Sequence, residues 1–230
     1  MNVPQCRTFS QQDSQTCLAK MGIDEQDIID ALTATLYERR RTTKLHPVID
    51  GGFRFWSELV ASLRSVLISK DCGWTMVRQN RMELVSNPTH SINLIITSGD
   101  KDTGLADGWP KTKNAKGEAT MSIVSSNSDT IEMFPSEHPM HSTDGLALIP
   151  VSSADSTKTY IVLYYYDASK QEIRCEISFP VGMKVVNGFA KVNYWSERLI
   201  ISPLPFDGAD IFPEEDFTDD VSISISIEMK

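Results

Sequence analysis

The residues best suited to chemistry lie in one long polar segment, residues 98–117. It contains four glycines, a tryptophan, and three lysines within positions 111–116. Most connections in compact domains are about 4–6 residues long, and longer ones are often functional. Backbone amides near glycines, together with lysine ammonium groups, can hold phosphate, and an exposed tryptophan can stack on a base or anchor a partner. The candidate binding residues of this segment are Trp109, Lys111, Lys113, Asn114 and Lys116.

The glycine spacing does not define a nucleotide motif. It matches neither a Walker A sequence nor a dinucleotide-binding fingerprint. The ordinary alternative is a solvated hairpin extension, because glycine and lysine are common in loops. A second basic group, Arg39, Arg40 and Arg41, ends a predicted helix, where cations are favourable. This group supports phosphate binding only if the fold brings it beside the three lysines.

A metal site is a weaker hypothesis. Glu137, His138, His141 and Asp144 lie close in sequence, and a His-x-x-His pair with carboxylates can ligate zinc. Pro139 prevents a regular helix from fixing the two imidazoles, so a polar loop is the preferred interpretation. We predict no metal and no cofactor.

Catalytic signatures are also missing from the sequence. No Gly-x-Ser-x-Gly or recognisable catalytic cysteine is found. Glu228 and Lys230 have a nuclease-like Glu-x-Lys spacing, but a charged strand end explains them. A hydrolase or nuclease with acids dispersed over Asp100, Asp102, Glu137 and Asp144 is the third hypothesis for function. The protein is therefore not predicted to be an enzyme.

Composition favours a globular protein. The chain has 230 residues, 40% hydrophobic residues and a net charge of −9, so nucleic acid could bind only through a local basic patch. No run approaches the ~18 apolar residues of a membrane span. The four cysteines are irregularly spaced and no secretory signal precedes them, so free thiols and a cytoplasmic location are expected.

Periodicity predicts an α+β fold in a single domain, residues 23–230, after a flexible arm over 1–22. Apolar residues at helical spacing predict helices over 24–40 and 53–69. From residue 74 the period is two, which predicts a mainly antiparallel sheet or sandwich that carries the two helices. The strands are expected over 74–79, 82–86, 91–97, 119–125, 146–151, 158–166, 171–179, 189–194, 198–202 and 221–228. Residues 203–220, with seven acids and no base, form an acidic connector.

Three functions remain open from the sequence. The first is a non-enzymatic accessory subunit of a bacterial or mobile-element complex, which binds a protein partner through the 98–117 loop and the acidic connector. The alternative is a nucleic-acid or nucleotide-binding protein that uses the loop lysines and Trp109. The third is the dispersed hydrolase. The regular final strand, 221–228, could also form a homodimer by sheet extension.

Overall fold

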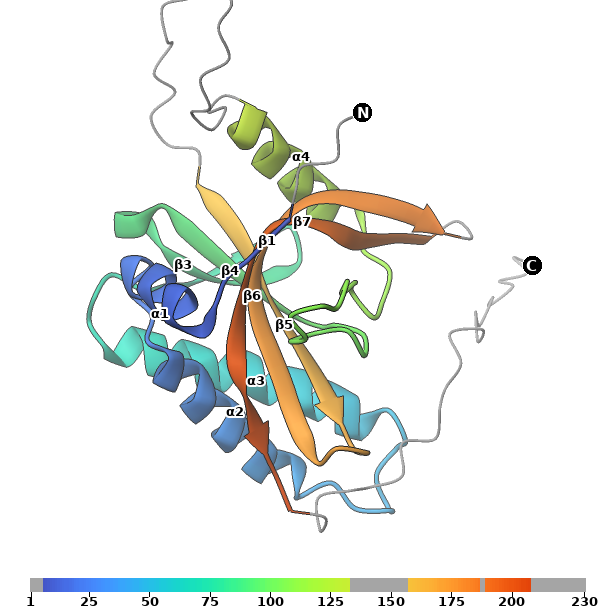
Figure 1. The fold of residues 1–230 in the computed structure, drawn as a ribbon. Coiled ribbons are helices and arrows are strands. Elements are labelled where there is room, and N and C mark those ends of the chain that lie inside the picture. Colours follow the sequence, from blue (N-terminus) through green and yellow to red (C-terminus); the bar gives the residue numbers. More distant parts are fainter. Residues whose placement is uncertain (1–5, 133–156, 187–188, 208–230) are drawn as a thin grey trace, which may run out of the picture.

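A seven-stranded sheet organises the part of the chain that the structure describes (Figure 1). The computed structural model describes residues 6–132, 157–186 and 189–207. Within them the sheet order is β1-β7-β6-β5-β4-β3-β2. The strands are β1 (Arg7–Thr8), β2 (Thr75–Gln79), β3 (Met82–Asn87), β4 (Ile92–Ser98), β5 (Lys158–Asp167), β6 (Glu172–Val186) and β7 (Phe189–Pro205). The described helices are α1 (Gln11–Lys20), α2 (Glu25–Arg39), α3 (Asp50–Ser69) and α4 (Glu118–Glu132). The α+β class is confirmed.

The sheet is mixed, with four antiparallel and two parallel pairings among the described strands, so it is mainly antiparallel as expected. β4 pairs with β5 and β1 pairs with β7 in parallel, while the other neighbouring strands are antiparallel. The strands predicted over 189–194 and 198–202 are one strand, β7, whose pairing with β6 contains register shifts. The described strands form one sheet rather than the two layers of a sandwich.

Helix α1 replaces the predicted flexible arm. Ser10 accepts a hydrogen bond from the backbone N–H of Asp13 and caps the helix. Leu18 is buried in the main core. The sequence pattern does not reveal this helix, because Cys17 and Leu18 are adjacent and no apolar stripe runs along it.

Helix α4 replaces the strand predicted over 119–125. Val124 and Asn127, three residues apart, are both buried against the sheet. The Asn127 amide donates to the carbonyls of Thr159 and Pro180 and accepts the Thr159 N–H. These three hydrogen bonds satisfy a buried amide and fix α4 on β5 and β6.

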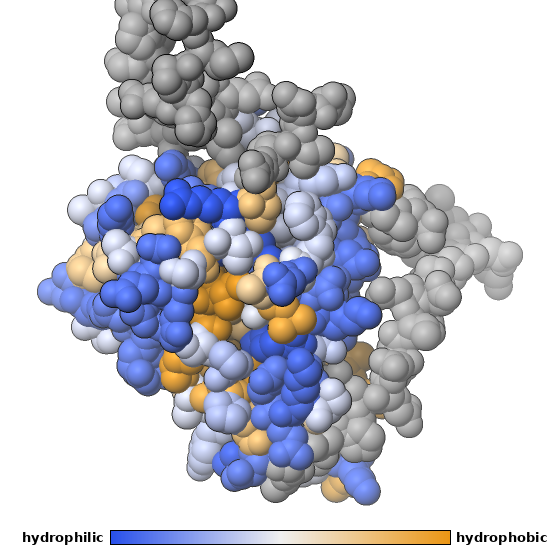
Figure 2. Space-filling view, in the orientation of Figure 1, coloured by the Kyte–Doolittle hydropathy of each residue, from blue (hydrophilic) through white to orange (hydrophobic). Residues whose placement is uncertain are grey.

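Apolar residues fill both faces of the sheet. On one face α1, α2 and α3 enclose the larger core, which includes Leu32, Leu63 and Leu94. On the other, α4 packs over a smaller cluster that includes Leu163 and Trp195. Hydrophilic residues cover much of the face seen in Figure 2, and apolar residues reach the surface near its centre. In the described ranges no helix is both long and apolar enough to cross a membrane.

Candidate ligand-binding cavity

A buried ion pair fixes the 98–117 loop to the sheet. The Arg198 guanidinium on β7 donates to both carboxylate oxygens of Glu176 on β6, at 2.6 and 3.1 Å. The same guanidinium donates to the loop carbonyls of Gly108 and Leu105, at 2.7 and 3.0 Å. The Gly104 N–H donates to Glu176 at 2.8 Å. Charge-assisted hydrogen bonds in a buried site are strong and directional, so this segment has a defined shape.

Gly104 permits the close approach of the loop to the sheet. Its φ is +71°, a left-handed conformation that favours glycine. A Cβ at this position would lie 2.9 Å from the Cβ of Arg174. A side chain here would therefore push the loop away from Glu176.

Two further contacts hold the second half of the loop. Trp195 donates its indole N–H to the Pro110 carbonyl at 2.7 Å. Thr112 donates its backbone N–H to the Val192 carbonyl, and its hydroxyl accepts the Val192 N–H. The loop is an ordered layer on the sheet, which differs from the solvated hairpin extension weighed in the sequence analysis.

A cavity of about 560 Å³ opens where β3 separates from β4. The pairing of these strands ends at Leu84 and Ile95. Beyond that point the Ile96 carbonyl accepts the Trp56 indole N–H at 3.1 Å, and the Ser98 carbonyl accepts the Lys113 N–H at 2.9 Å. The walls of the cavity are formed by the N-terminal part of α3, the carboxyl ends of the parallel strands β4 and β5, and loop residues 113–116. Ligand cavities are typically ~300–1,000 Å³, and the carboxyl ends of parallel strands are a common place for them.

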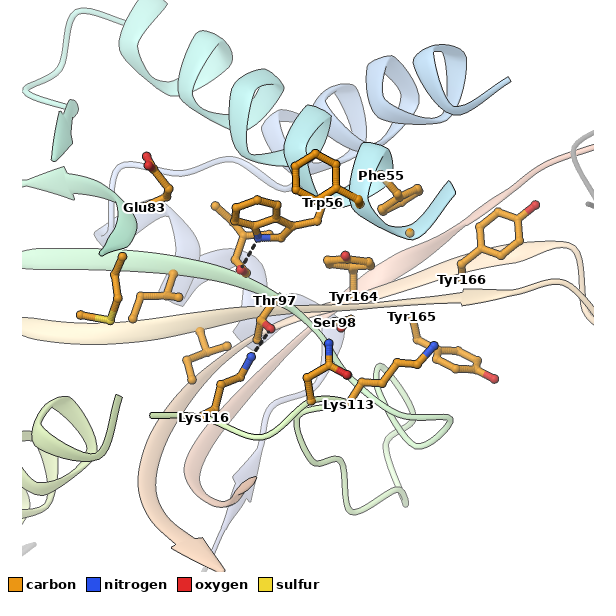
Figure 3. A pocket seen from close by; sticks show the side chains of 18 of the residues that line it. Phe55, Trp56, Glu83, Thr97, Ser98, Lys113, Lys116, Tyr164, Tyr165 and Tyr166 are labelled. Carbon is orange, nitrogen blue, oxygen red and sulfur yellow. Dashed lines mark hydrogen bonds between the residues drawn. The ribbon is translucent and has the colours of Figure 1, made fainter. Parts of the chain in front are cut away.

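Lys116 places an amine in the wall of this cavity (Figure 3). Its Nζ donates to the Thr97 hydroxyl at 2.6 Å. Burial lowers the pKa of Lys116 to about 8, because an ammonium loses hydration there. The described residues supply no ion pair to this amine. Glu83, also in the wall, is instead bound by Arg64 and Arg78 at 2.7 and 3.2 Å.

Aromatic side chains line the rest of the cavity. Figure 3 shows Phe55 and Trp56 projecting from α3, across the cavity from Lys113 and Lys116. Tyr164 and Tyr165, adjacent on β5, also line it. The cavity therefore combines flat apolar surfaces with a desolvated cation, which suits a planar anion.

The predicted binding residues divide into two groups. Arg39, Lys113, Asn114 and Lys116 line the cavity, so the fold brings part of the arginine run to the same cavity as part of the lysine cluster. The Arg39 guanidinium lies over the Tyr166 ring, 3.8 Å from its centroid. The predicted residues outside the cavity lining are Arg40, Arg41, Trp109 and Lys111. Among these, Trp109 is 50% exposed, and Arg41 pairs with Glu38 at the surface.

The other hypotheses receive less structural information. Glu137, His138, His141, Asp144, Glu228, Lys230 and the final strand lie outside the described residues. Within the described part of the chain no group of three His, Cys, Asp or Glu residues could hold a metal ion. Asp100 accepts backbone N–H groups of Asp102 and Lys111, so it shapes the loop. Burial raises the pKa of Asp100.

Sequence reasoning missed Trp56, Thr97, Tyr164 and Tyr165 as cavity residues. Trp56 belongs to the apolar stripe of α3, which indicated only core packing. The tyrosines occur in an aromatic run of a strand, a pattern that is typical of sheet core. Thr97 carries no signal by itself, because its role depends on Lys116, nineteen positions away.

Comparison with protein-family models, curated proteins and solved structures found no significant match.

Proposed function

We propose that the protein binds a small planar anion, of the size of a single nucleotide or an aryl phosphate, in the cavity beside Lys116. The observation that carries the proposal is a largely buried amine, without an ion pair among the described residues, in a cavity with aromatic walls. Burying a cation without a compensating charge is costly. An anionic ligand would offset that cost, and the aromatic rings would hold its planar part.

The test is calorimetric titration of the full chain with phenyl phosphate, benzoate, adenosine monophosphate and inorganic phosphate. We expect a planar anion to bind more tightly than inorganic phosphate. Lys116→Met should weaken that binding about 10- to 100-fold, since a hydrogen bond to a charged group contributes about 1.5–3 kcal/mol. Lys111→Met is the matched control, because Lys111 is on the same loop but outside the cavity lining. This variant should bind the planar anion with the same affinity as the wild type. Equal loss in both variants, or no binding, would reject the proposal.

The affinity should also depend on pH. The Lys116 ammonium holds the anion below its pKa of about 8 and becomes neutral above it. Binding of a permanently charged anion such as benzoate should therefore weaken as the pH rises from 7 to 9. The same titration of Lys116→Met should show no such loss.

A second candidate function, binding of a protein partner, is favoured by one surface feature. Five exposed apolar residues follow one another in sequence over the end of α2, the α2–α3 connection and the start of α3. This exposed apolar cluster comprises Tyr37, Leu45, Val48, Ile49 and Phe53. Leu45 and Ile49 are 96% and 75% exposed. Exposed apolar patches with a polar rim are typical of interaction sites. Arg41 and Lys44 lie beside the cluster in the chain, so the partner surface would be apolar with an acidic rim.

We expect Leu45→Asp combined with Ile49→Asp to abolish capture of this partner without unfolding the protein, since both side chains are exposed. The measurement is a pull-down with wild type, the double variant and Met76→Asp, which changes an exposed apolar residue on β2. A partner retained by Met76→Asp and lost by the double variant supports the interaction. Equal capture by all three proteins excludes the cluster as the binding surface.

A further inference from the structure

The amine of Lys116 has the surroundings of a nucleophile as well as those of an anion-binding group. Thr97 accepts one of its hydrogen bonds from one side. The described residues supply no carboxylate that pairs with it. Lys116 also lines the cavity of about 560 Å³, so its amine is within reach of a ligand bound there.

We propose that Lys116 forms a reversible Schiff base with a conjugated or aromatic aldehyde that carries an anionic group and binds in this cavity. The inference deepens the proposed function, since it concerns the same cavity and names the chemical class of its ligand. Lysine amines desolvated in apolar pockets are the usual Schiff-base nucleophiles. Aromatic walls suit a conjugated carbonyl, whose ring and imine lie in one plane.

The reaction balances without a further reactant. The ammonium first releases a proton to water, and the amine lone pair then attacks the carbonyl carbon to form a C–N bond. The carbonyl oxygen takes up protons and leaves as water, while the nitrogen loses its remaining protons as the C=N bond forms. Nothing is oxidised or reduced, and hydrolysis reverses the step.

Two features help this step at neutral pH. With a pKa of about 8, roughly a tenth of the Lys116 amine is neutral at pH 7. The hydrogen bond to Thr97 directs the nitrogen, so Thr97 acts as a positioning residue. Lys113, also in the cavity wall, remains available to hold the anionic group of the aldehyde.

The experiment is reductive trapping on the full-length chain at pH 8, with 4-carboxybenzaldehyde as the probe and cyanoborohydride as the reductant. Peptide mass spectrometry then locates the adduct. We expect Lys116 to react at least about tenfold faster than the exposed Lys111 and Lys113. Thr97→Val should slow trapping while benzoate still binds, which a purely structural role of Thr97 would not produce. Lys111→Met should be trapped like the wild type.

The combination of benzoate binding and labelling separates this inference from the proposed function. Benzoate binding in the cavity without preferential labelling of Lys116 would reject the Schiff base and leave the proposed function standing. Neither benzoate binding nor labelling would reject both. Trapping at Lys116 that excess benzoate suppresses would support both.

Discussion

Replacing Arg198 by methionine is expected to lower the free energy of unfolding by about 3–5 kcal/mol, because it leaves the buried Glu176 carboxylate without its counter-ion. The change also removes the donors to the Gly108 and Leu105 carbonyls, so the 98–117 loop loses its main attachment. Urea unfolding of the purified variant measures the loss.

The matched control for this prediction is Arg41→Met. Arg41 also pairs with a glutamate, Glu38, but its side chain is 68% exposed, and we expect a change within about 0.5 kcal/mol. If Arg198→Met does not fold, Glu176→Gln tests the same pair with its volume kept. Methionine at both 198 and 176 should be less destabilising than the sum of the single changes, because no isolated charge remains. Additive effects would contradict a coupled buried pair.

The second large effect is a gain in stability. Lys116→Met should raise the free energy of unfolding at pH 7, by an amount on the order of 3 kcal/mol, which corresponds to a pKa lowered from 10.5 to about 8. The folded protein releases the Lys116 proton above pH 8, whereas the unfolded chain keeps it up to about 10.5. Between these values the unfolded state binds more protons, so wild-type stability rises with pH and the advantage of the variant declines.

Unfolding measured for both proteins from pH 7 to 10.5 tests this account, and comparing them cancels the titration of other groups. Lys111→Met is the control, since that side chain is exposed and hydrated in both states. An advantage of Lys116→Met that stays constant across this range would show that charge burial is not its cause. Binding sites often contain residues that lower the stability of the fold, and a buried lysine in a cavity wall fits this trade-off between function and stability.

Local patterns predicted some elements and missed others for identifiable reasons. The alternation along β6, where Ile173, Cys175 and Ile177 are buried, reports one face of a strand directly. On the other face of β6 the pattern suggests the wrong environment. The charged residues Arg174 and Glu176 suggest exposure to solvent, but both are buried beneath the loop. Their partners lie on β5 and β7, and no local pattern encodes such pairings.

The candidate site was predictable only in part for the same reason. The lysines of the long loop and Arg39 were candidates from the sequence, and Lys113, Lys116 and Arg39 line the cavity. Which lysine matters depends on burial: Lys116 contacts Thr97 on β4, whereas Lys111 remains exposed. The difference between the two lysines arises from tertiary packing, since Thr97 and Lys116 are nineteen positions apart. Composition and residue spacing cannot predict such a contact.

A desolvated Lys116 amine in a ligand-binding cavity should have a distinct NMR signature in protein that carries ¹³C at the lysine ε-carbons. We expect one ε-carbon signal to titrate near pH 8, to be missing in Lys116→Met, and to show a higher pKa when phenyl phosphate or benzoate is added, because a bound anion stabilises the ammonium. A Lys116 signal that titrates near 10.5, or one that no planar anion moves, would contradict the account.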